Sequence, residues 1–98
     1  MSRIKIIFSA GALQDMLEAK QWYNQQQSGL GNRFQSDVEE VIKRIKMNPT
    51  FASIKFGSIR TAACSSFPYA VHYEYEELEK LVRIISIFHF SRKPYWMD

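Results

Sequence analysis

At Asn48-Pro49 the hydrophobic period of the sequence changes from that of helices to that of strands, and this change limits the folds that the chain can adopt. Before it, apolar residues recur at helical spacing over two segments, whereas after it they alternate with the period of two that is typical of strands. Proline can neither donate a backbone hydrogen bond nor fit inside a continuing helix, so the second helix must end there. A chain with helices first and strands afterwards is expected to be an α+β protein.

One short strand and two helices are expected in the first half of the chain. Residues 3–8 alternate in polarity and predict an edge strand. Ser9 can cap a helix over about residues 10–27, which the glycine-containing link 28–31 ends. Because this link is short, the second helix should run antiparallel to the first. It carries an apolar stripe formed by Phe34, Val38, Val41, Ile42 and Ile45.

Three further strands are expected in the second half. Residues 53–64 predict a weak strand that Gly57-Ser58 interrupts, residues 69–75 alternate in polarity, and residues 81–90 are apolar at nearly every position, which favours an interior strand. The order β-α-α-β-β-β predicts a four-stranded, mainly antiparallel twisted sheet with the helical hairpin packed on one face and the other face partly free. A chain of 98 residues can build one core, so residues 1–98 are expected to form a single domain.

Charge is segregated along the chain. The sequence holds 13 Lys and Arg and 10 Asp and Glu, and four of these acids (Glu74, Glu76, Glu77 and Glu79) fall within six residues. Outside that acidic window thirteen basic residues stand against six acidic ones, a net charge of +7 instead of the +3 of the whole chain. Such a balance is compatible with a nucleic acid or an acidic protein as partner, and equally with an ordinary solvated surface.

The sequence gives no support for a disulfide, a metal or cofactor site, or a location in the membrane. Cys64 is the only cysteine, and His72 and His89 lack companion ligands, so neither a disulfide nor a metal site is expected. Cys64 also lacks an activating neighbour and is expected to be structural. Gly29-Leu30-Gly31 lacks the strand and lysine of a phosphate-binding loop, and no cofactor is expected. With neither a signal peptide nor an apolar run of about 20 residues, a cytoplasmic location away from the membrane is expected.

The C-terminal run from His89 to Trp96 gathers groups that suit phosphate chemistry. Cleavage of RNA without a metal requires a proton-transfer group and cations that stabilise the phosphorane. His89 or Tyr95 could transfer the proton, while Arg92 and Arg60, the latter on a neighbouring strand, could supply the cations. The alternative interpretation is a polar strand end followed by a solvated terminus.

A second candidate site is a basic cluster that could contact a nucleic acid or another target. Helix C-termini attract cations in any case, so the cluster can also be explained by the helix alone. The aromatic residues Trp22, Tyr23, Tyr69, Tyr73 and Tyr75 could stack on bases, but at helical and strand spacing we interpret them as core. The basic cluster consists of Lys43, Arg44, Lys46 and Lys55, with Lys93 in the C-terminal run.

Taken together, the sequence resembles the RelE/ParE superfamily of toxins from bacterial type II toxin–antitoxin systems, over nearly the whole chain. The order and spacing of several short motifs carry the resemblance, and the fold that it implies agrees with the β-α-α-β-β-β order. The motifs are Asp15-Met16-Leu17-Glu18-Ala19 with Trp22-Tyr23, Gly29-Leu30-Gly31 with Phe34, Asn48-Pro49, Ile59-Arg60, Phe67-Pro68-Tyr69-Ala70-Val71 with Tyr73, and His89, Arg92, Pro94 and Trp96.

The resemblance implies a small basic toxin that inhibits growth, is associated with plasmid stabilisation, and is neutralised by an acidic antitoxin encoded beside it. RelE-like members cleave mRNA on the ribosome, whereas ParE-like members inhibit DNA gyrase and need no nuclease site, so whether this chain is an enzyme depends on its target. Arg60, His89 and Arg92 fall at functional positions of the family. Because Thr61 to Ser65 offer no charge to such a site, gyrase inhibition is slightly favoured. An inactive relative that only binds a partner is the third alternative.

Overall fold

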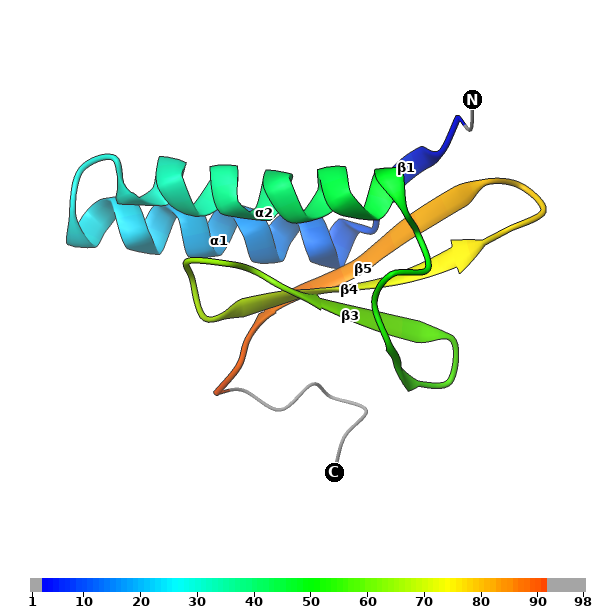
Figure 1. Cartoon of the computed structure of the whole chain (residues 1–98). Coiled ribbons are helices and arrows are strands. Elements are labelled where there is room, and N and C mark those ends of the chain that lie inside the picture. Colours follow the sequence, from blue (N-terminus) through cyan, green and yellow to red (C-terminus); the bar gives the residue numbers. More distant parts are fainter. Residues whose placement is uncertain (1–2, 92–98) are drawn as a thin grey trace.

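The structure, a computed structural model, describes residues 3–91, so Arg92, Lys93 and Tyr95 lie outside the described residues. Two helices and five strands are present in this range (Figure 1). The predicted α+β class is confirmed. In chain order the elements are β1 (Lys5–Phe8), α1 (Ala10–Gln26), α2 (Leu30–Met47), β2 (Ile54–Phe56), β3 (Ile59–Ala63), β4 (Tyr69–Glu76) and β5 (Leu81–His89).

All five strands belong to one sheet with the order β1-β5-β4-β3-β2. β1 pairs with β5 in parallel, and every other pair is antiparallel. The apolar strand β5 therefore lies inside the sheet and β1 lies at its edge, as the sequence predicts. The register places Arg60 of β3 opposite Tyr73 and His89 of β5 opposite Tyr69, so both partners belong to β4.

The prediction of four strands is wrong by one. Residues 53–64 form the two strands β2 and β3, which pair with each other in an antiparallel hairpin. Gly57 has a φ of 56°, in the left-handed region that glycine adopts without steric cost. The Gly57-Ser58 pair, expected to interrupt one strand, therefore reverses the chain and creates an additional edge strand.

The two helices pack closely because small and polar residues shape their connection. Ser9 caps α1 by accepting a hydrogen bond from the Ala12 amide at 2.9 Å. Gly29 adopts a φ of 87° before α2, and the Gly31 amide donates to Asn24 Oδ1 at 2.7 Å. Figure 1 shows the resulting hairpin lying along one face of the sheet. Neither helix within residues 3–91 combines the length and hydropathy needed to cross a membrane.

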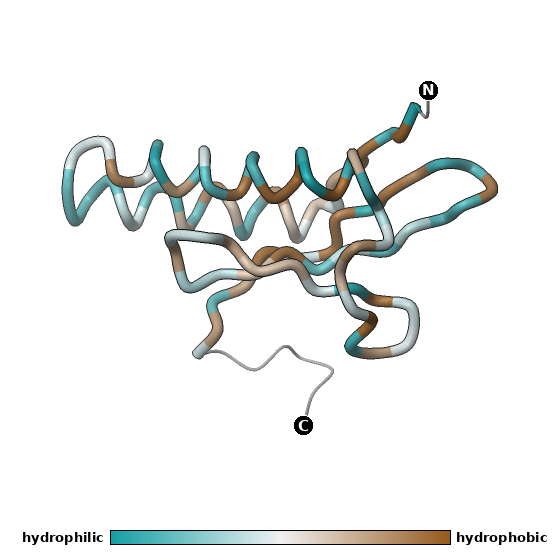
Figure 2. Tube along the Cα trace, viewed as in Figure 1, coloured by the Kyte–Doolittle hydropathy of each residue, from teal (hydrophilic) through white to brown (hydrophobic). Residues whose placement is uncertain are grey.

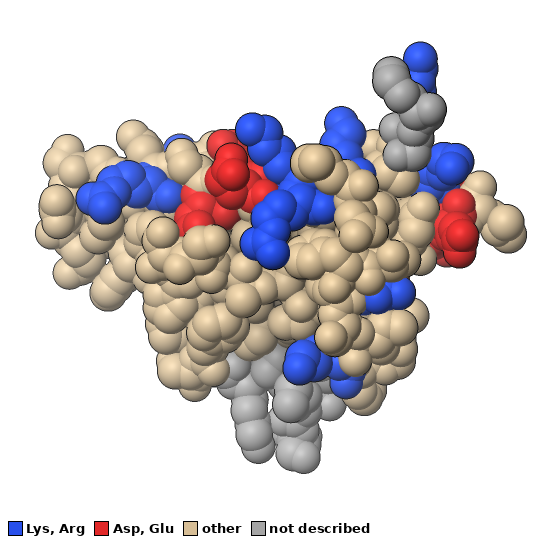
Figure 3. Space-filling view, viewed as in Figure 1, with Lys and Arg blue, Asp and Glu red and all other residues tan. Residues whose placement is uncertain are grey.

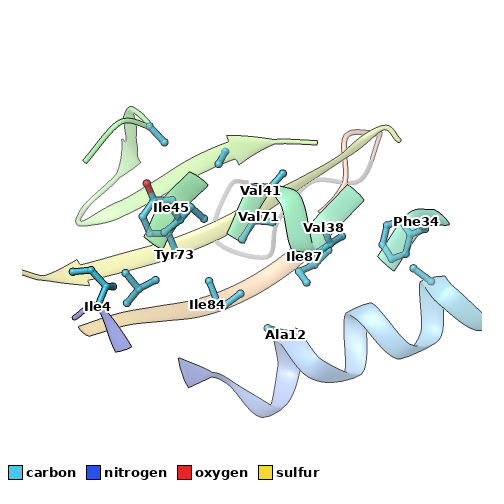
Figure 4. Packing of buried hydrophobic residues seen from close by; sticks show 14 residues of the cluster. Ile4, Ala12, Phe34, Val38, Val41, Ile45, Val71, Tyr73, Ile84 and Ile87 are labelled. Carbon is cyan, nitrogen blue, oxygen red and sulfur yellow. The ribbon is translucent and has the colours of Figure 1, made fainter. Parts of the chain in front are cut away.

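The core lies between α2 and the central strands. Hydrophilic and hydrophobic residues alternate along α2 (Figure 2). The residues of its apolar stripe pack in one cluster with residues of the strands. Figure 4 shows the cluster from close by. Burial of each large side chain contributes roughly 1.5–3 kcal/mol, so this layer is the main source of stability. The fully buried large residues are Phe34, Val38, Val41, Ile45, Val71, Tyr73, Val82 and Ile84.

The face of the sheet opposite the helices, here called the far face, is not left free at its centre. His72 is 3% exposed, and its ring packs against that of Phe88 at 4.1 Å. Ser86 Oγ lies 3.1 Å from His72 Nδ1. Burial lowers the pKa of His72 from 6.5 to about 4, so the ring is neutral at pH 7. The expectation of a partly free face therefore does not hold at His72 or at the fully buried Ala70.

Candidate functional site

Arg60, one of the predicted catalytic cations, binds the backbone of its own chain. Its Nη1 donates to the Ala52 carbonyl at 2.6 Å and to the Thr50 carbonyl at 3.3 Å. Tyr73, opposite Arg60 in the sheet, donates its hydroxyl to the Pro49 carbonyl at 2.8 Å. Together the two side chains fasten the connection between α2 and β2 onto the sheet.

His89, the predicted proton-transfer group, is the last residue of β5. Its Nδ1 accepts a hydrogen bond from the Ser91 amide at 3.0 Å and lies 2.7 Å from Ser91 Oγ. Because a backbone amide can only donate, Nδ1 carries no proton and the neutral ring has its hydrogen on Nε2. The ring is half-buried and stands edge-on to Tyr69, with centroids 5.1 Å apart.

The structure does not bring Arg60 and His89 together. Their partners on β4, Tyr73 and Tyr69, are four residues apart, which corresponds to about 13 Å along a strand. Since β3 and β5 flank β4 on opposite sides, the two residues are also separated by about 10 Å across the sheet. The backbone positions of the two residues are therefore roughly 16 Å apart. The Arg60 guanidinium is also bound to the Ala52 and Thr50 carbonyls and does not point to His89. Arg92 and Tyr95, the other members of the predicted set, lie outside the described residues.

The predicted basic cluster is partly engaged within the protein. Lys43 forms an exposed ion pair with Glu40 at 3.7 Å, and Arg44 lies over the Phe51 ring at 4.9 Å. Lys46 and Lys55 are exposed, on the last turn of α2 and on β2 respectively. Figure 3 shows Lys and Arg side chains spread along the face that carries α2, with acidic side chains among them. This face is therefore mixed in charge, with its cations distributed along its length.

A cleft between α1 and the end of β5 combines His89 with aromatic residues that the sequence led us to interpret as core and with the carboxylates of Asp15 and Glu18, which no pattern in the sequence had led us to propose for a site. We call it the α1–β5 cleft, and its volume is about 550 Å³. Asp15, Glu18 and Trp22 have the i, i+3, i+7 spacing that places them on one side of α1. This spacing is the signal that could have revealed the cleft. Its lining includes Asp15, Glu18, Trp22, Tyr23, Tyr69 and His89.

Side chains of α1 hold β5 where β1 ends. β1 pairs with β5 only as far as Ile84. Beyond it, Ser9 Oγ donates to the Ile85 carbonyl at 2.9 Å, and the Ile87 amide donates to Asp15 Oδ2 at 3.0 Å. These contacts take the place of the hydrogen bonds that a neighbouring strand would make. They fix the position of α1 relative to the last residues of β5, which form one wall of the cleft.

Asp37 holds the loop between β3 and β4. Its buried carboxylate accepts backbone hydrogen bonds from Ser65, Ser66 and Phe67 at 3.3, 2.9 and 2.9 Å. Burial, with a smaller effect of Asp37, raises the pKa of the Cys64 thiol to about 12. A thiol that stays protonated is a poor nucleophile, in agreement with a structural role. No group of three potential metal ligands occurs within residues 3–91.

Comparisons with known proteins find similarity in structure but not in sequence. No family model matches the sequence, and no curated protein matches it. A structure of the chromosomal ParDE toxin–antitoxin system from P. aeruginosa superposes with a TM-score of 0.76 at 13% identity, covering 88% of this chain and 95% of that one.

Two E. coli structures are also similar. The isolated RelE toxin has a TM-score of 0.70 at 13% identity, covering 96% of this chain and 92% of that one. The intact RelBE toxin–antitoxin complex has a TM-score of 0.71 at 14% identity, covering 92% of this chain and 100% of that one. The chain therefore has the RelE/ParE fold, and the resemblance derived from its motifs is confirmed at the level of the fold.

Proposed function

We propose that the chain is the toxin of a type II toxin–antitoxin system and that an acidic antitoxin encoded beside it neutralises it. The fold, shared with ParDE and RelE proteins, carries this proposal. The positive charge outside residues 74–79 supports it, because opposite charges speed association. In this proposal residues 1–98 act as one toxin domain in the cytoplasm.

Inhibition of DNA gyrase by binding is the mechanism that we favour. A metal-free nuclease needs a proton-transfer group and a cation within hydrogen-bond reach of one phosphate. The Arg60 guanidinium is bound to the Ala52 carbonyl, and the backbone of Arg60 lies roughly 16 Å from that of His89. Among the described residues that line the cleft of His89 there is no Lys or Arg. The basic residues Lys43, Arg44, Lys46 and Lys55, with Lys93, would then contact the target.

Induction of the chain without its partner in a bacterial host tests the mechanism. Gyrase inhibition predicts growth arrest, DNA breaks, an induced DNA-damage response and loss of supercoiling activity in vitro, with mRNA intact. Sequencing of RNA 5′ ends provides the decisive comparison. Discrete ribosome-dependent cuts would instead identify a RelE-like endoribonuclease, and normal growth at a verified protein level would identify an inactive relative.

The antitoxin part of the proposal has its own test. The open reading frame adjacent to the gene should encode a short acidic protein, and its co-expression should restore growth and allow both proteins to be purified together. A scrambled sequence of the same charge serves as control. Rescue by the scrambled protein, or no binding by the neighbouring one, would contradict this part of the proposal.

A further inference from the structure

We propose that one side of α1 binds the same side of α1 in a second copy of the chain, so that two chains form a dimer around a two-fold axis. The two helices run antiparallel in this dimer, with Leu17 of each copy next to the axis. This inference goes beyond the proposed toxin function and does not depend on it. It rests on the residues of α1, all of which the structure describes.

Large apolar side chains of α1 are exposed, whereas its most buried residues are small. Ala12 is fully buried, but Leu13 and Leu17 are 47% and 54% exposed. These leucines are four residues apart and therefore lie one turn apart on the same side of the helix. Trp22, expected in the core, is also exposed, whereas Tyr23 packs against the core as predicted. A helix that is apolar on more than one side is typically covered on each of them, so α1 is expected to have a partner.

The exposed residues of α1 carry almost no charge. Among the ten exposed residues of this helix only Glu18 is charged, whereas six of the nine exposed residues of α2 are Lys, Arg or Glu. Because no exposed residue of α1 is a Lys or Arg, this helix offers an acidic antitoxin no electrostatic attraction. A surface that meets its own copy across a two-fold axis must instead avoid like charges near that axis. The lack of charge on α1 therefore favours a second copy of the chain as its partner.

A shallow hollow of about 420 Å³ lies on α1 beside the exposed leucines, and we call it the α1 hollow. Its described lining, all from α1, is Leu17, Lys20, Gln21, Asn24 and Gln25. The first four of these residues have the spacing i, i+3, i+4, i+7. Four residues at this spacing form the hole that receives one side chain of a facing helix in knobs-into-holes packing. The α1 hollow is therefore shaped to receive a side chain from another helix.

An antiparallel arrangement around Leu17 brings an exposed leucine to this hollow. When the two-fold axis passes next to Leu17, the residue four positions before it faces the residue four positions after it in the other copy. Leu13 of one copy then faces Gln21, in the middle of the α1 hollow of the other copy, and symmetry repeats the contact. Lys20 faces Gln14, and its own counterpart lies about 9 Å away along the helices, so the two cations do not meet. The same surface thus supplies both the knob and the hole.

Analytical ultracentrifugation of the whole chain over a range of concentrations tests whether the dimer forms. One pair of helices buries less area than a standard interface, so we expect reversible association with a Kd of about 10–100 µM. Leu17→Glu should weaken it at least about tenfold, because the change places two like charges side by side at the axis. Leu78→Glu is the matched control, since Leu78 is fully exposed in the turn between β4 and β5. A parent chain that stays monomeric up to about 1 mM, or equal weakening by both variants, would overturn the proposal.

Cysteine cross-linking tests the antiparallel arrangement without introducing a charge. In a Cys64→Ser background, Leu17→Cys should form a disulfide-linked dimer on mild oxidation, because residue 17 of one copy lies next to residue 17 of the other. Gln25→Cys is the control. Eight residues from the axis, its two copies are separated by about 24 Å, beyond the reach of a disulfide. Equal cross-linking of both variants, or no cross-linking of Leu17→Cys at a concentration where the chain is dimeric, would refute this interface.

The same variants distinguish a second copy from the antitoxin as the occupant of this side of α1. Leu17→Glu and Leu78→Glu should both still co-purify with the acidic protein encoded by the adjacent reading frame. If the parent chain is monomeric and only Leu17→Glu loses that protein, this side of α1 binds the antitoxin and the dimer proposal is wrong. Dimerisation of a chain that proves non-toxic would leave this inference intact, so its failure and that of the proposed function are separable.

Discussion

Arg60, together with Tyr73, holds the connection between the helical and the strand-rich halves of the molecule. Its guanidinium reaches the Ala52 and Thr50 carbonyls, and the Tyr73 hydroxyl reaches the Pro49 carbonyl beside them. Tyr73 donates to the carbonyl of Pro49, the proline that ends the helical pattern, and Arg60 donates to carbonyls one and three residues after it. The sequence suggests a catalytic role for Arg60. Its hydrogen bonds indicate a structural role instead, in which it stabilises this loop.

Replacement of Arg60 by alanine should destabilise the protein. We expect Arg60→Ala to lower the free energy of unfolding by about 1.5–3 kcal/mol, as measured by urea denaturation, because it removes a charged donor from the part-buried Ala52 carbonyl. Arg83→Ala is the control, because the Arg83–Glu76 pair at 3.1 Å is largely exposed and worth at most about 1 kcal/mol. If Arg60→Ala unfolds like the parent but abolishes toxicity, Arg60 acts on the target and our structural interpretation fails.

His72 should make stability depend on pH. Its pKa is about 4 in the folded chain and 6.5 when unperturbed, because burial disfavours the charged ring. Between these values the unfolded state binds more protons, so stability should be complete above pH 6.5 and should fall as the pH drops towards 4. Urea midpoints measured from pH 7.5 to 4 check this. His72→Phe should flatten the curve in that window; an unchanged slope would assign the effect to another group.

The contact between the two helices depends on one glycine. A Cβ at Gly31 would lie 2.1 Å from the Lys20 carbonyl oxygen and 2.6 Å from Asn24 Cγ. Gly31→Ala should therefore push α1 and α2 apart and cost about 1–3 kcal/mol or more by thermal or urea unfolding. Gly11→Ala is the matched change on α1, where the nearest atom would be Ser9 Oγ at 3.9 Å.

The control should be neutral or stabilising by about 0.5–1 kcal/mol, because alanine is the better helix former. Similar losses in both variants would show that helix propensity, and not the clash at Gly31, determines the result.

The elements themselves follow from local patterns in the sequence, whereas the sites do not. Periodicity places both helices to within a residue or two, and Ser9 and Pro49 mark where they begin and end. The additional strand β2 was missed because the sequence does not tell whether Gly57 interrupts one strand or forms the turn between two strands. The α1–β5 cleft joins residues 15–22 to Tyr69 and His89, a juxtaposition that only the register of the sheet defines.

At the scale of the whole molecule, the fold is retained while the sequence is not. Identities of 13–14% accompany TM-scores of 0.70–0.76, because a buried stripe on α2 and alternating strands can be built from many apolar residues. Surface residues are not constrained in this way. Function in this fold must therefore be argued from exposed groups such as Lys46, Lys55 and Trp22, and the distribution of charge is the first of their properties to test.

The last prediction concerns that distribution. If the partner is acidic, its association rate should fall about tenfold or more as NaCl is raised from 50 to 500 mM, because salt screens exposed charges. The double variant Lys43→Glu with Lys46→Glu should slow association at low salt, as measured by stopped flow. The control is the double variant Lys5→Glu with Arg33→Glu, which changes the net charge by the same amount. Its substitutions lie on β1 and at the start of α2, away from the last turns of that helix. A larger effect of the first pair means that the end of α2 steers the partner. Equal slowing would mean that net charge alone acts, and rates insensitive to salt would exclude an electrostatically steered antitoxin altogether.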